Sequence, residues 1–320
     1  MLSVLVWAAL STACGPAPAP DTEADASSRR AGSPRLVSLA PHLTELAFDA
    51  GAGGQLIGVV AYSDYPPAAR DIARIGDAFN LDYERIAELS PDVVLTWEGG
   101  TPPTALERLK KMGFEVVPLS TLRLDDVAEA VIRIGQIAGD PEAALEAAAA
   151  YRAALGEVRR VYGDRERIRV FYQVSLEPLY TPGGPHFISE LIALCGGLNI
   201  FSDLDLQAAA VSHEAVLARN PQLIIVGQQW LSETIEHWRR FSSASPRVTG
   251  IDADVVTRPG LRLARGASAI CAEIDSVRAA RAKNAEVASP YYGRASTALP
   301  GRGPHAPARV LPRKADLTSG

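Results

Sequence analysis

Two glutamates at equivalent points of a repeated pattern are the clearest candidates for a specific role in this sequence. Glu84 and Glu214 each follow a helix-capping residue by two positions, and each precedes a proline by seven. Glutamate in a first helical turn commonly just complements the helix dipole. The matched positions in the two copies favour something more than that.

Residue sets typical of enzymes and metal carriers are missing from the sequence. There is no G-x-S-x-G elbow and no P-loop, and the run Gly51–Gly54 follows a predicted helix instead of opening one, which is typical of a C-cap and turn. The five histidines, at 42, 186, 213, 237 and 305, contain no pair at metal-ligand spacing. We therefore expect no metal site and no enzyme, and a hydrolase remains an alternative only through residues assembled at long range.

The elements that carry the two glutamates form two copies of one unit. A buried strand, 36–39, precedes a helix that Thr44 opens and Gly51 ends; a second strand, 169–174, precedes one that Ser189 opens and Gly196 ends, with seven residues from opening to glycine in both. Further on, Asp82 and Ser212 cap the helices of the two glutamates, and buried strands follow at 93–96 and 223–226. A repeat at this long interval predicts two similar lobes, and clefts between lobes bind ligands.

Short apolar runs alternate with helical patterns throughout both halves, which predicts an α/β fold with a mostly parallel sheet flanked by helices in each lobe. We expect an N-terminal lobe over 34–122, linking helices over 123–162 and a C-terminal lobe over 163–281. The second linking helix, from about 141 to 162, contains no loop that could act as a hinge, so a single long rigid helix should join the lobes. Residues 255–257 are interpreted as a short strand and 264–280 as the last helix.

The N-terminus has the features of an export signal. Residues 2–13 are apolar or small and too few to span a membrane, and Leu10–Cys14 is similar to a bacterial lipobox, so we predict a signal peptide over 1–14 with lipidation of Cys14. Ser11 stands where leucine is usual and no basic residue precedes the run, so soluble export and an ordinary N-terminal anchor remain alternatives. Residues 15–33 are interpreted as a disordered tether and 282–320 as a disordered tail.

Composition and cysteine usage agree with export. The net charge of −5 gives no basic footprint for nucleic acid, and 47% hydrophobic residues in 320 suffice for sizeable cores. Cys195 and Cys271 could pair in an oxidising compartment, and two buried free thiols are the alternative.

Five stretches, LAPHLTELAFDAG, AYSDYPPAA, ERIAELSPDVVLTWEGG, FISELIALCGGLNIF and VSHEAVLARNP, closely resemble the family of periplasmic cobalamin-binding proteins of ABC importers. The resemblance covers about 35–275 and implies the helix-strutted class of substrate-binding proteins, which also carries haem and siderophores. It implies a monomer that holds no cofactor and delivers a corrinoid, as transported ligand, to a permease dimer with its ATPase subunits. It also implies a periplasmic or extracytoplasmic location, with membrane contact only through a lipid anchor.

The resemblance also implies the site residues. The positions that match the family's ligand cleft are Tyr62, Trp97, Tyr180, Asp254 and Arg258, with Phe79 as substitute for a family tryptophan near Ala78. Aromatic faces would cover the apolar corrin ring, while a carboxylate and a guanidinium would serve its amide rim. A second family tryptophan is replaced by Ala208, so the pocket should be less aromatic. The resemblance further implies that Glu84 and Glu214 meet arginines of the permease.

Other interpretations stay open. Trp97 could belong to the core, Tyr62 and Tyr180 to a rim, and Asp254 with Arg258 to an ordinary surface pair. The same fold could bind haem, for which Tyr62 is the candidate axial ligand, or an anionic ferric siderophore, for which only Arg258 and Arg262 offer nearby charge. A lipid-anchored enzyme or sensor is a third class.

Overall fold

The computed structural model describes residues 32–77, 79–241 and 246–288. The predicted signal segment with Cys14, most of the tether, Ala78 and tail residues 289–320 lie outside this part of the chain. Within it, no helix is both long and apolar enough to cross a membrane.

The first sheet contains the strands of the N-terminal lobe. Its order is β2-β1-β3-β4, and every neighbouring pair is parallel. The strands are β1 (Leu36–Ser38), β2 (Leu56–Val59), β3 (Val93–Trp97) and β4 (Glu115–Leu119). Its helices are α1 (Pro41–Asp49), α2 (Tyr83–Leu89) and α3 (Pro103–Lys111), with short 3-10 turns η1 (Gly53–Gln55) and η2 (Pro67–Asp71). The predicted parallel arrangement is confirmed.

The second sheet repeats this plan with order β11-β10-β5-β8, again parallel throughout. Its strands are β5 (Ile168–Gln173), β8 (Gly197–Asn199), β10 (Leu223–Gly227) and β11 (Arg247–Ile251). A small antiparallel sheet that the sequence pattern did not indicate joins β6 (Ser175–Leu176), β7 (Leu179–Pro182) and β9 (Ala208–Ala210). The helices are α6 (Phe187–Leu194), α7 (His213–Ala218), η3 (Gln228–Trp230), α8 (Leu231–Arg239) and α9 (Ala253–Val256).

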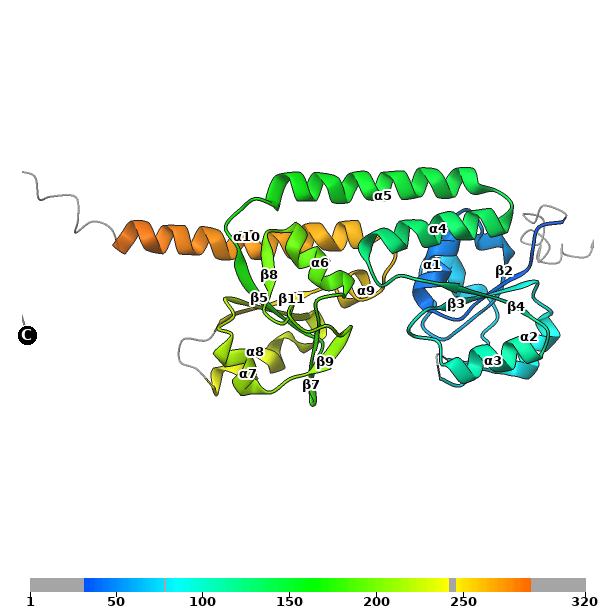
Figure 1. The fold of residues 1–320 in the computed structure, drawn as a ribbon, viewed down its shortest axis with the longest axis horizontal. Coiled ribbons are helices and arrows are strands. Elements are labelled where there is room, and N and C mark those ends of the chain that lie inside the picture. Colours follow the sequence, from blue (N-terminus) through cyan, green and yellow to red (C-terminus); the bar gives the residue numbers. More distant parts are fainter. Residues whose placement is uncertain (1–31, 78, 242–245, 289–320) are drawn as a thin grey trace, which may run out of the picture. The chain divides into compact units, whose positions relative to one another are not determined.

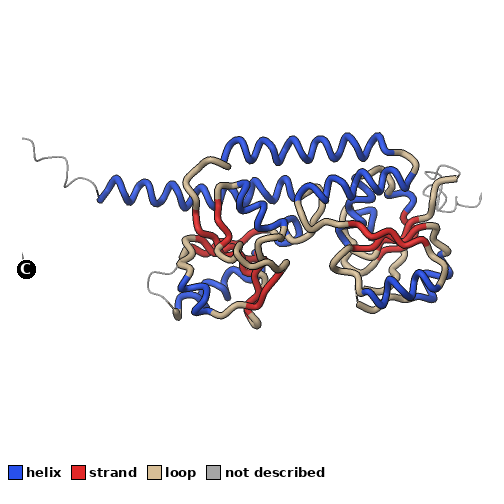
Figure 2. The backbone as a smooth tube through the Cα atoms, viewed as in Figure 1, coloured by secondary structure: helices blue, strands red, loops and turns tan. Residues whose placement is uncertain are grey.

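Two helices connect the lobes: α4 (Leu124–Ala138) and the 22-residue α5 (Pro141–Tyr162). Figures 1 and 2 show both on one side of the two sheets, with α2, α3, α7 and α8 on the other side. One buried cluster takes in side chains of both lobes and both connecting helices, among them Leu46, Val131, Tyr151, Ile188 and Ile270. This shared core explains why the lobes are joined by packed helices without a hinge loop.

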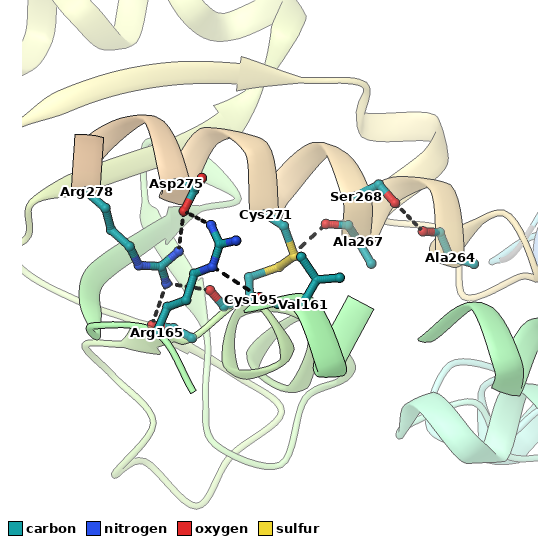
Figure 3. Close-up of a disulfide and its surroundings, with 10 residues drawn as sticks. Val161, Arg165, Cys195, Ala264, Ala267, Ser268, Cys271, Asp275 and Arg278 are labelled. Atoms are coloured by element: carbon teal, nitrogen blue, oxygen red, sulfur yellow. Dashed lines mark hydrogen bonds and ion pairs between the residues drawn. A yellow bond between two sulfur atoms is a disulfide. The ribbon is translucent and has the colours of Figure 1, made fainter. Parts of the chain in front are cut away.

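A disulfide joins Cys195, which follows α6, to Cys271 of the last helix, α10 (Leu263–Ala288) (Figure 3). The predicted pairing is confirmed, with 4.7 Å between the Cα atoms. Beside it, Arg278 donates hydrogen bonds to the carbonyl oxygens of Cys195 and Gly196 (Figure 3). The bond therefore fixes α10 to α6 at a point where polar contacts also hold them.

Four local expectations are wrong. Thr44 and Ser189 do not cap their helices, because their hydroxyls are turned inward: Thr44 bonds Ser38 and Ser189 bonds the carbonyl of Gly183. The helices begin earlier, at Pro41 and Phe187. Residues 255–257 are not a strand but lie at the end of α9, and the last helix continues to 288, beyond the expected start of the tail.

Candidate ligand-binding site

A network of charged side chains crosses from the C-terminal lobe to the N-terminal lobe, and Arg258 lies at its centre. The side chain of Arg258 is 16% exposed; its guanidinium donates to Asp64 at 2.6 Å and to Glu45 at 3.4 Å, and forms an ion pair with Asp254 at 3.2 Å. The hydrogen bond from Arg258 is the main reason why the pKa of Asp64 lies below its usual range. The predicted Asp254–Arg258 pair is thus present, but it belongs to a larger network.

The local fold explains how this pair is positioned. Asp252 caps the short helix α9 by accepting a hydrogen bond from the backbone N–H of Asp254. Arg258 follows four residues after Asp254, within reach of its carboxylate. The turn of α9 and its C-cap Thr257 bring the side chain of Arg258 back toward Asp254, which the expected strand would not have done.

Glu45 is the most buried member of the network, and Arg262 is its bidentate partner. The side chain of Glu45 in α1 is 2% exposed, and Arg262 binds both its oxygens, at 2.9 Å through Nε and 2.7 Å through Nη2. The guanidinium carbon of Arg262 also lies 4.0 Å from the centre of the Tyr65 ring. Such a bidentate pair holds a carboxylate in one geometry, so it fixes the two lobes at this point.

Trp97, at the end of β3, packs edge to face against His42, with ring centres 5.0 Å apart. His42 is buried, and burial, followed by the charge of Arg258, lowers its pKa to about 3, so its imidazole is neutral. Gly100 lies directly on the indole: a Cβ there would come within 1.7 Å of the ring. The indole N–H is buried without a hydrogen-bond partner. Trp97 thus combines a packed ring with a polar group that a ligand could satisfy.

The other expected ligand residues differ in how they relate to this network. Tyr62 is 77% exposed in the left-handed backbone region (φ 64°), two residues before Asp64, which binds Arg258. Phe79 is 85% exposed, and Tyr180 of β7 is 39% exposed. No hydrogen bond, ion pair or ring contact within the described ranges joins Phe79 or Tyr180 to the network.

Two cavities in the C-terminal lobe adjoin the residues discussed above. One of about 520 Å³ is lined by Gln228, Gln229, Asp252, Ala253 and Asp254. Another of about 390 Å³ lies beside β6 and is lined in part by Trp230. Asp254 is therefore both a partner of Arg258 and part of a cavity wall.

Ala208 pairs with Pro182 in the small sheet and is exposed, so it adds no aromatic surface.

The two glutamates of the repeat occupy equivalent places. Glu84 lies in the first turn of α2 and Glu214 in the first turn of α7, both exposed, behind the caps Asp82 and Ser212. Helix α2 leads into β3 and α7 leads into β10, and each of these strands is one of the two central strands of its sheet. Figure 1 shows α2 and α7 on the same side of the molecule as each other, away from α4 and α5.

Sequence reasoning missed His42, Glu45 and Asp64 as members of the site, and it noted Arg262 only as a nearby charge. A usable signal existed for Glu45. It lies between Leu43 and Leu46 on the buried stripe of α1, and a charge at such a position requires a partner. Nothing in the spacing identifies that partner, since Arg262 lies 217 positions away along the chain.

Among the described residues, no group of three or more His, Cys, Asp or Glu side chains is arranged to hold a metal ion.

Comparison with known proteins covers nearly the whole described chain. The family model "Periplasmic binding protein" matches residues 36–261. A vitamin B12-binding protein of Vibrio cholerae is 34% identical over 242 residues, which are 74% of this chain and 87% of that protein. One of Pectobacterium carotovorum is 36% identical over 248 residues, 76% of this chain and 89% of that protein.

The solved structures give the same picture of the fold. The periplasmic vitamin B12 binding protein BtuF of Vibrio cholerae superposes with a TM-score of 0.71 and 34% identity, covering 77% of this chain and 98% of that one. The periplasmic haem-binding protein RhuT from Roseiflexus sp. RS-1 superposes with a TM-score of 0.68 at 22% identity, covering 77% and 99%. At that identity the second likeness concerns the fold alone.

Proposed function

The chain belongs to the periplasmic binding protein family, and from this premise we propose that it captures cobalamin or a related corrinoid outside the cytoplasm and delivers it to an ABC importer. The single observation that supports this best is the 34% identity, across both lobes, to proteins named for vitamin B12 binding. In this role the protein binds its ligand and releases it unchanged.

The geometry is suited to such a ligand. A corrin is broad and apolar, and amide side chains surround it. Trp97 and Tyr62 offer aromatic faces, Arg258 offers donors for amide oxygens, and Asp254 accepts from amide N–H groups. The indole N–H of Trp97, which lacks a partner, adds one more donor. With Ala208 where the family resemblance implies a tryptophan, we expect a less aromatic contact on the side of the C-terminal lobe.

Haem is the alternative ligand, since haem binders share the fold. It would require an axial ligand, and the exposed Tyr62 is the candidate, because His42 is only 4% exposed and packs against Trp97. An anionic siderophore is disfavoured, since carboxylates already balance the positive charges of Arg258 and Arg262, whereas a neutral amide needs only a free N–H of Arg258.

Mixing the purified protein with cyanocobalamin and then desalting it tests the proposal. We expect the corrin absorbance to elute with the protein, at about one mole of corrinoid per mole of protein. Elution of haem absorbance with the protein, and of no corrin absorbance, would replace this ligand with the alternative.

The remaining parts of the proposal concern location and partner. We propose that Cys14 is lipidated and anchors the protein, and that Glu84 and Glu214 contact arginines on the two halves of a permease dimer. Metabolic labelling with a radioactive fatty acid, compared with a Cys14→Ala variant, tests the anchor. Label retained by the variant would exclude Cys14 as the lipidated residue.

A further inference from the structure

A cavity of about 820 Å³ lies on the side of the linking helices, apart from the ligand site. It is bounded by the start of α4, the second half of α5 and the end of α6, and it contains none of Trp97, Asp254 and Arg258. Its walls include Arg123, Asp125, Tyr151, Arg152, Leu155, Arg159, Arg160, Asp164, Glu190, Ala193 and Leu194. Its volume is within the range of small-molecule sites.

The hydroxyl of Tyr151 is the unusual feature of this cavity. Tyr151 is 3% exposed, and its hydroxyl is buried without a hydrogen-bond partner. Burial, then the charges of Glu190 and Asp125, raise its pKa, so the group keeps its proton and remains a donor. A buried donor without an acceptor is unfavourable, and an acceptor inside the cavity would remove that cost.

The carboxylates near Tyr151 are already engaged. Glu190 accepts from the backbone N–H of Leu124 and pairs with Arg123 at 2.8 Å. Asp125 accepts from Arg152 at 2.6 Å. Neither carboxylate accepts a hydrogen bond from Tyr151 in this structure, so a molecule that enters the cavity can supply the acceptor.

Positive charge is available at the other end. Arg160 pairs with Glu157, whereas Arg159 makes no ion pair or side-chain hydrogen bond with the residues that the structure describes. Arg159 follows Tyr151 by eight residues on α5, so the two Cα atoms are separated by about 12 Å along the helix axis. Between them, Leu155 and Leu194 give the wall an apolar middle.

We propose that this cavity is a second binding site, for an elongated organic anion with an acceptor group at each end and an apolar body, such as an aliphatic dicarboxylate. One end accepts a hydrogen bond from Tyr151 and the other meets Arg159. The site lies beside the connection between the lobes, and it is independent of the corrinoid proposal because it uses none of the same residues.

Calorimetric titration of the full-length protein with suberate, an eight-carbon dicarboxylate, tests the proposal. We expect saturable binding of one suberate, unchanged by prior loading with cyanocobalamin, and weakened at least fivefold by Tyr151→Phe and by Arg159→Gln. The matched control is Arg239→Gln, an exposed arginine at the end of α8, which should bind suberate as the unaltered protein does. Phenylalanine keeps the ring of Tyr151, so the melting temperature should not fall.

Three outcomes would overturn the proposal. The first is no saturable binding of suberate, which means that water alone satisfies Tyr151. The second is equal affinity in the Tyr151→Phe and Arg159→Gln variants. The third is equally tight binding of inorganic phosphate, which is too short to reach both ends.

Discussion

Arg262 binds Glu45 through both nitrogen–oxygen pairs, at 2.7 and 2.9 Å, although the two residues belong to different lobes. Only 2% of the Glu45 side chain is exposed, so its charge depends on this arginine. The pair joins α1 to the segment between α9 and α10. Arg258 also donates to Glu45, and His42, which packs against Trp97, lies three residues before Glu45 in α1. The Glu45–Arg262 pair therefore connects the stability of the lobe contact to the geometry of the ligand site.

Replacing Glu45 by Gln should destabilise the protein by about 2–4 kcal/mol, because Arg262 would keep its buried charge and lose its carboxylate. The value is at the low end for a buried pair since 20% of the Arg262 side chain stays exposed. Urea denaturation measures it. Glu88→Gln, which breaks an exposed pair with Arg85, is the control and should change the free energy of unfolding by less than about 1 kcal/mol. Equal effects of both changes would show that Glu45 is not specially dependent on Arg262.

Replacing Glu84 and Glu214 together by Ala should leave corrinoid binding intact and abolish or slow uptake, with milder effects for each single change. Exposed charges set orientation and association rate more than affinity. High salt screens the same charge pairs in the unaltered protein, so the difference in uptake between the unaltered protein and the double variant should shrink at high salt. Uptake in cells that depend on this protein is the measurement, and Glu88→Ala on the same helix is the control. Normal uptake with the double variant would reduce both glutamates to helix-dipole partners.

The disulfide should contribute roughly 4 kcal/mol to the free energy of unfolding in the chain-entropy model, given a separation of 76 residues. Urea denaturation of protein with Cys195 and Cys271 both replaced by Ala, compared with the oxidised form, measures this. Mass spectrometry of unreduced peptides from exported protein should show the two cysteines linked. Two free thiols in that material would contradict the assignment.

Stability should decline as the pH falls from about 6.5 toward 4. Burial lowers the pKa of His186 to about 4 and of His42 to about 3, so both stay neutral when folded and gain protons on unfolding. Asp49 acts in the opposite direction, because burial raises its pKa to about 6 and the folded form takes up its proton first. Two histidines against one carboxyl leave a net loss of stability in acid.

The variant His186→Asn isolates one part of this pH dependence. Asn can still cap α6, as the His186 ring does through the backbone N–H of Ile188, but it does not titrate. Denaturation at pH 7 and at pH 4.5 should show a smaller loss of stability in the variant, by at most about 3 kcal/mol. An unchanged pH dependence would mean that His186 is not the group responsible.

Apolar runs and caps are local signals, and they predicted both parallel sheets and the long linking helix. The sequence-based prediction failed where tertiary contacts determine the local structure. Thr44 resembles a cap in sequence, yet its hydroxyl is used by Ser38, and a proline three residues earlier starts the helix. The small sheet of β6, β7 and β9 was missed because these strands have only two to four residues.

The site was predicted in part for the same reason. The spacing of Asp254 and Arg258 is local and could be matched to a family, and the structure forms that pair. Glu45, Asp64 and Arg262 come together only through the fold, from positions about 200 apart. Long-range ion pairs of this kind leave no periodic trace in a sequence.

Calorimetric titration of the purified protein with cyanocobalamin, and separately with haem, tests the central claim most directly. We predict saturable binding of cyanocobalamin at one site and none of haem. Trp97→Ala should weaken cobalamin binding by about 1–3 kcal/mol, the usual scale for burying an aromatic face, while the control Trp230→Ala, exposed in the C-terminal lobe, should not. Heat with haem and none with any corrinoid would contradict the account.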